Sequence, residues 1–123
     1  MWPETLGLLV DIRDAARYIV DDTEGVAYES FIADQRLRQA VLYSFLVIGE
    51  ASHRIRRRDP ELTQSIFEIG DAIAMRNVVI HGYDIVDYAI VWQTIQDKLP
   101  SLILQIETML PDGERGKSEE KTR

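Results

Sequence analysis

Length, composition and charge limit what this chain can be. It has 123 residues, of which 46% are hydrophobic and none is cysteine. One domain of this size buries roughly two thirds of the surface that its unfolded chain exposes, so a packed core needs no metal or disulfide. The lack of cysteine excludes disulfides, thiolate zinc sites and cysteine nucleophiles. The formal net charge of −7 argues against a general DNA-coating protein, which needs many phosphate contacts.

No segment of the sequence predicts export or a membrane span. The start, Met1–Glu4, has no basic region followed by an apolar stretch, so we expect no signal peptide. The most continuous apolar stretch, Ala40–Ile48, is far shorter than the roughly 20 residues that cross a bilayer. We therefore expect a soluble, cytoplasmic protein.

Hydrophobic residues recur at helical spacing along most of the chain, and no strand pattern competes. The pattern predicts helices over Thr5–Asp22, Asp34–Arg57, Asp59–Ile69, about Asp71–Gly82, and Asp87–Leu110, the last kinked or split at Pro100. Before the second helix, Phe31 and Ile32 are expected to form a short buried lead-in. The expected fold is all-α, an up-and-down bundle of four or five helices. It forms a single domain over residues 1–110, followed by a mobile charged tail over residues 111–123.

The helix predicted over Asp34–Arg57 is apolar on two sides. One stripe runs through Leu37, Val41, Ile48 and Ile55, and a second face carries Leu42, Phe45 and Leu46. Both faces must be covered. Either a second subunit covers one of them, or the helix lies at the centre of its own bundle.

The two histidines of the chain are the first candidates for chemistry. Glu50 and His53 have the Glu-x-x-His spacing of di-iron bundles. That site needs a second such pair, and position 78, three before His81, is valine. The sequence therefore predicts no metal site, and it contains no glycine-rich phosphate loop.

His81 lies in a more informative segment, Arg76-Asn77-Val78-Val79-Ile80-His81-Gly82-Tyr83. Arg76 and His81 are five residues apart, which separates their directions by roughly 140° on an ideal helix. By spacing alone, the two fit a surface arginine and a helix-terminal histidine better than a catalytic pair.

The surrounding residues change this interpretation. The pattern Arg76-Asn77-x-x-x-His81-x-Tyr83 resembles the signature of the HepT-like branch of the HEPN family of small helical ribonucleases. The segment Ile48–Ala51 resembles the family's second helix, and Trp92 and Leu99-Pro100 resemble its last. The resemblance covers roughly Leu6–Leu110. The Arg-x4-His motif alone is permissive, but with the Gly-Glu-Ala segment and the tyrosine it becomes specific.

The resemblance implies a homodimeric toxin of a toxin–antitoxin pair. Such toxins are endoribonucleases that need no metal or other cofactor, with Arg76 and His81 as the catalytic pair in a cleft between two subunits. Asn77 would support the pair by orienting His81 or the phosphate. The implied partner is a minimal nucleotidyltransferase antitoxin, which would block the site by transferring AMP from ATP to Tyr83.

The cations Arg54, Arg56 and Arg57 are placed less clearly. They fit a solvated helix end whose dipole they offset, and they are candidates for RNA contacts if that end flanks the motif. Two other functions stay open. The chain could be a non-catalytic HEPN nucleotide-binding or adaptor subunit of a nucleotidyltransferase complex, or a plain helical dimerisation module.

Overall fold

The computed structural model describes residues 2–66 and 69–111, and for residues 69–71 and 83 the backbone only. Within these ranges the chain is all-α, as predicted, and has no strand. Its elements are α1 (Pro3–Thr23), α2 (Tyr28–Ala33), α3 (Gln35–Arg58), α4 (Pro60–Ser65), α5 (Ile69–Gly82), the 3-10 helix η1 (Tyr83–Ile85), α6 (Tyr88–Asp97) and α7 (Leu99–Met109). The predicted tail over 111–123 lies almost wholly outside the described residues.

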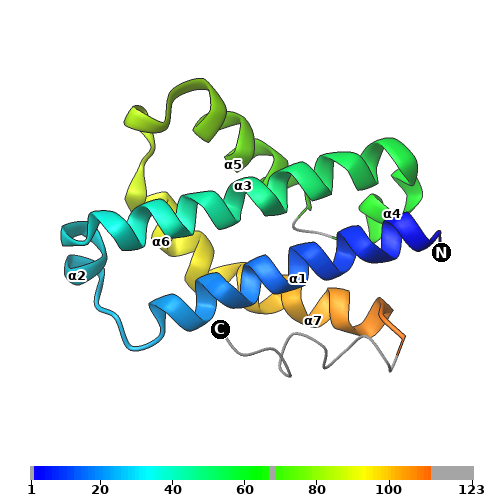
Figure 1. Ribbon diagram of the computed structural model, residues 1–123, viewed down its shortest axis with the longest axis horizontal. Coiled ribbons are helices and arrows are strands. Elements are labelled where there is room, and N and C mark those ends of the chain that lie inside the picture. The colour runs from blue at the N-terminus through cyan, green and yellow to red at the C-terminus, as the bar shows by residue number, and fades with distance from the viewer. Residues whose placement is uncertain (1, 67–68, 112–123) are drawn as a thin grey trace.

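The two longest helices, α1 and α3, run side by side through the middle of the molecule (Figure 1). Helix α5 packs on the far side of α3, and α7 packs on the far side of α1. Helix α3 is therefore covered on both of its apolar sides by helices of its own chain. The alternative that places it at the centre of its own bundle is the one observed, so its second face no longer argues for a second subunit.

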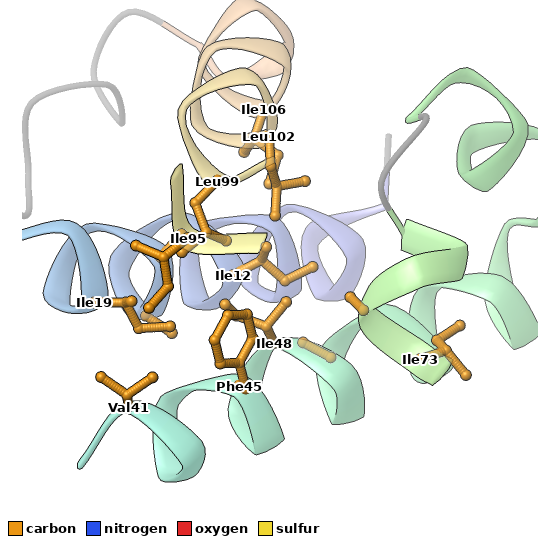
Figure 2. Close-up of a cluster of buried hydrophobic side chains, with 14 of the residues drawn as sticks. Ile12, Ile19, Val41, Phe45, Ile48, Ile73, Ile95, Leu99, Leu102 and Ile106 are labelled. Atoms are coloured by element: carbon orange, nitrogen blue, oxygen red, sulfur yellow. The ribbon is translucent and has the colours of Figure 1, made fainter. Parts of the chain in front are cut away.

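Large hydrophobic side chains from most of the helices form one core around α1. Figure 2 shows Ile12 and Ile19 from α1 facing Phe45 and Ile48 from α3, while Ile95 and Leu99 enter from the C-terminal helices. All six are at most 3% exposed. Fully burying one such side chain contributes about 1.5–3 kcal/mol, so this core sets the positions of the helices around it.

An aromatic cluster joins α2 to α6. The ring centroid of Phe31 lies 5.0 Å from that of Trp92 and 6.1 Å from that of Tyr88. Of the predicted buried lead-in, Phe31 is fully buried, whereas Ile32 is 38% exposed, so that part of the prediction is wrong. The two residues lie in a short helix, α2, and adjacent residues of a helix face different sides.

The residues at the helix ends predicted most of the helix boundaries correctly. Asp34 caps α3 by accepting a hydrogen bond from the Leu37 amide, and Asp59 caps α4 in the same way. Pro100 lies in the first turn of α7, so the predicted C-terminal helix is split at Lys98. The prediction that α4 reaches Ile69 is wrong, because α4 ends at Ser65 and Ile69 begins α5. No helix of the described residues is long and apolar enough to cross a membrane.

Candidate functional site

The predicted motif lies along α5, on the side of the bundle where that helix packs against α3. Gly49 of α3 allows this close packing. A Cβ atom at Gly49 would lie 2.2 Å from the Cβ of Arg76 and 3.0 Å from the carbonyl oxygen of Ala72. Real side chains do not approach so closely, so only glycine lets α5 pack here and bring Arg76 onto α3.

Two acceptors hold the guanidinium group of Arg76. Its Nε donates a hydrogen bond to Oε1 of Glu50 at 2.6 Å, and its Nη1 donates to Oδ1 of Asn77 at 2.8 Å. The side chains of Arg76 and Glu50 are 22% and 43% exposed. A planar guanidinium carries five donor hydrogens. Both Nη2 hydrogens and one Nη1 hydrogen therefore have no protein acceptor within the described residues, and they remain available to an anion.

Asn77 therefore contacts Arg76 in this chain. The sequence predicted that Asn77 orients either His81 or a phosphate, and the structure shows a hydrogen bond to it from Arg76. This fits the helix geometry, because adjacent side chains can meet when one of them is as long and flexible as arginine.

His81 lies in the last turn of α5, where its side chain is exposed. No hydrogen bond or ion pair holds its imidazole among the residues that the structure describes. Arg76 contacts α3 through Glu50, and positions five apart on an ideal helix point roughly 140° apart. No hydrogen bond joins Arg76 to His81 among the described residues.

Tyr83 is the first residue of η1, directly after Gly82 ends α5. The prediction that the motif helix ends at Gly82 is confirmed. Only the backbone of Tyr83 is described, and it lies two residues beyond His81 in the chain.

The cations of α3 are exposed in its last two turns. Arg54 lines a shallow hollow of about 290 Å³ together with Glu50, Tyr43 and Leu8. Arg54 thus lies one turn from the residue that holds Arg76. Arg56 and Arg57 lie at the end of the helix, where cations offset its dipole. Arg54 is therefore the only one of the three that we can place near the motif.

Exposed apolar side chains surround the end of α5. Val78 is 46% exposed, Ile80 52% and Ile85 76%, and Ile90 of α6 is 56% exposed. We call these four residues the α5–α6 patch. Three of them, with Met75 and Val86, line a groove of about 490 Å³. Apolar groups gathered on a surface beside polar candidates commonly mark an interaction site.

Sequence reasoning missed the roles of Gly49 and Glu50. In the sequence, Glu50 was considered as a metal ligand with His53 and as part of the family's Gly-Glu-Ala segment, whereas the structure pairs it with an arginine 26 residues away. Gly49 gave a usable signal. A glycine inside a strong helix costs about 1 kcal/mol relative to alanine, so it usually has a packing reason. Nothing in the sequence identifies the helix that it packs against.

Arg76 and His81 lie on α5, and Gly49 and Glu50 lie on α3, which packs against it. A helical domain with this arrangement fits the class of HEPN proteins. Comparison with known families agrees, because the family model described as "Ribonuclease HepT-like" matches residues 12–109. The chain therefore belongs to the HepT-like family of HEPN ribonucleases.

Individual relatives support the same assignment. A Thermococcus cleftensis protein named "Probable ribonuclease HepT" is 33% identical over 98 residues, which cover 76% of this chain and 84% of that protein. A Methanocaldococcus jannaschii protein, named as a candidate RNase, is 33% identical over 111 residues, which cover 90% of each chain. A Caldanaerobacter subterraneus subsp. tengcongensis protein with a similar name is 28% identical over 102 residues, which cover 83% of this chain and 90% of that protein. No solved structure gives a significant match.

Proposed function

We propose that the protein is a metal-independent endoribonuclease with Arg76 and His81 as its catalytic pair. The observation that supports this most directly is the state of Arg76. Its guanidinium is held at two points, Nε by Glu50 and Nη1 by Asn77, and its remaining donors are unoccupied within the described residues. A guanidinium oriented in this way can bind two phosphate oxygens and stabilise the negative charge that builds up on them.

The proposed reaction uses the nucleophile that RNA itself carries. The 2′-oxygen attacks the neighbouring phosphorus, so a 2′-O–P bond forms and the P–O5′ bond breaks. The proton of the 2′-hydroxyl must be accepted, and the leaving 5′-oxygen must receive one. An imidazole with a reference pKa near 6.5 can do either at neutral pH, and exposed His81 is free to reach a substrate. The products are a 2′,3′-cyclic phosphate and a 5′-hydroxyl.

Incubating the purified protein with RNA in the presence of a chelator tests this proposal. We expect cleavage, with 2′,3′-cyclic phosphate ends on the 5′ fragments. Cleavage that requires Mg²⁺ would contradict the mechanism. A lack of cleavage under all conditions, with RNA or nucleotide still bound, would favour the non-catalytic adaptor subunit.

We further propose that the active form is a homodimer whose sites combine residues of two subunits. On an ideal helix, positions five apart such as Arg76 and His81 point roughly 140° apart, so one subunit would present only part of a site. Val78 and Ile80 of the α5–α6 patch lie within three positions of His81 in the chain, and the patch offers apolar surface for a second copy. A two-fold axis there would bring the two motifs toward each other.

Mixing two inactive variants tests the composite site. Subunits with Arg76→Ala and subunits with His81→Ala are each expected to be inactive alone. If each site takes its arginine from one subunit and its histidine from the other, a mixed dimer holds one intact site, and random mixing restores about a quarter of the wild-type activity. Sites built within single subunits would give no restoration. Sedimentation of the mixture checks that dimers form.

The resemblance to HepT-like toxins also suggests how the activity is controlled. We propose that a minimal nucleotidyltransferase antitoxin transfers AMP to the hydroxyl of Tyr83, which releases pyrophosphate from ATP. An anionic adduct two residues from His81 would repel RNA phosphates, by the same electrostatics as phosphorylation.

Co-expression with a minimal nucleotidyltransferase tests the modification. We expect mass spectrometry to detect AMP on the peptide that contains Tyr83, growth inhibition to be relieved, and Tyr83→Phe to remain toxic. Tyr88 of α6, which is half-buried beside Phe31, serves as the internal control and should carry no adduct. An unmodified Tyr83 in a fully neutralised complex would refute the proposal.

A further inference from the structure

The ion pair between Arg76 and Glu50 joins two helices at the motif, and it has two opposing effects on an RNA site. It fixes Nε of the guanidinium and leaves both Nη2 hydrogens without an acceptor among the described residues. It also places a negative charge 2.6 Å from the group that is to attract phosphate. The first effect favours catalysis, whereas the second weakens substrate binding.

The simplest alternative is that this pair only fastens α5 to α3. Partly exposed ion pairs contribute little to stability in general, and the chain contains a useful comparison. Arg17 of α1 donates to Glu107 of α7 at 2.7 Å, with side chains that are 19% and 23% exposed. That pair also joins two helices, is no more exposed, and lies away from the motif.

Three observations indicate that Glu50 does more than fasten α5 to α3. Gly49 brings the backbones of α3 and α5 so close that Arg76 is already packed against α3 without the ion pair. The carboxylate meets Nε, the donor nearest the aliphatic stem, and leaves the outer edge of the guanidinium open. Asn77 takes one hydrogen of Nη1, so the plane of the group is fixed at two points.

We infer that Glu50 is a positioning residue, which holds the plane of Arg76 so that its outer edge is presented to an RNA phosphate. The inference rests on the proposed ribonuclease function. Glu50 touches neither the substrate nor the reacting atoms, and it acts through Arg76. Its charge lowers the affinity for RNA, while its oxygen improves the orientation of the arginine.

Two substitutions separate orientation from charge. Glu50→Gln keeps an oxygen that accepts from Nε but removes the negative charge, so KM for a short single-stranded RNA should fall about threefold while kcat changes little. Glu50→Ala removes the acceptor as well, so kcat should fall on the order of tenfold. Glu107→Ala, the matched control, should leave kcat and KM as in the wild type.

A second measurement distinguishes failure of this inference from failure of the proposed function. The NMR order parameter of the Arg76 Nε–H bond reports the orientation without any RNA. We expect it to fall in Glu50→Ala and to be retained in Glu50→Gln and Glu107→Ala. A wild-type protein that cleaves no RNA would refute the proposed ribonuclease function. The order parameter alone would then test whether Glu50 positions Arg76. An order parameter that is unchanged in Glu50→Ala, or equal kcat values for Glu50→Ala and Glu107→Ala, would overturn the positioning role.

Discussion

Replacing His81 with alanine is expected to slow RNA cleavage by about 10²–10⁴-fold, the contribution typical of one positioned acid or base. The folded structure should be unaffected, because the His81 side chain is exposed and makes no hydrogen bond among the described residues. The loss should therefore appear in kcat, with an unchanged melting temperature. Single-turnover cleavage of a labelled RNA measures the rate.

The chain offers a matched control for this substitution. His53 is the second of its two histidines, and it lies half-buried in α3 with its Nδ1 atom buried. His53→Gln should change stability slightly and leave the rate of cleavage near that of the wild type. Cleavage that survives His81→Ala, or that depends equally on His53, would remove His81 from the mechanism.

Replacing Gly49 with alanine should be the most damaging small change outside the motif. The added Cβ would overlap the Cβ of Arg76, which is the rigid base of that side chain and cannot swing aside. Helix α5 must then move away from α3. Overpacking of this kind costs typically about 1–3 kcal/mol, and the shift should also separate Arg76 from Glu50 and lower cleavage.

Replacing Gly7 of α1 with alanine is expected to have the opposite effect on stability. No atom lies within 4 Å of a Cβ built at Gly7, and the residue is exposed within a helix. Gly7→Ala should therefore stabilise the protein by about 0.5–1 kcal/mol through helix propensity alone. Urea unfolding of the two variants measures the difference. A Gly49→Ala protein as stable and as active as Gly7→Ala would show that α5 has room to adjust.

Sequence patterns predicted the helix boundaries correctly where the residues that set them lie close together in the chain. The Asp34 and Asp59 caps and the break at Pro100 all act within a few residues, and the structure has each of them. The boundary at Gly70 was misplaced because a single glycine costs a helix only about 1 kcal/mol. The helix begins at Ile69 and continues through Gly70.

The arrangement of the site was harder to predict because it depends on packing between helices. Helical spacing predicts that Arg76 and His81 diverge within one chain. It could not show that Arg76 turns toward Glu50, since the two lie on different helices and 26 residues apart. The two-sided apolar pattern of α3 was detected correctly, but only the structure shows that α1 and α5 cover both sides.

The position of α5 at the margin of the bundle has a consequence for its dynamics. Helix α1 is held by both α3 and α7, whereas α5 packs mainly against α3 and leaves Val78 and Ile80 exposed to solvent. Elements with few buried neighbours open locally at lower free energy than the core. The amide hydrogens of α5 should therefore exchange with solvent well before those of α1. Any molecule that covers the free side of this helix would slow that exchange and order the motif at the same time.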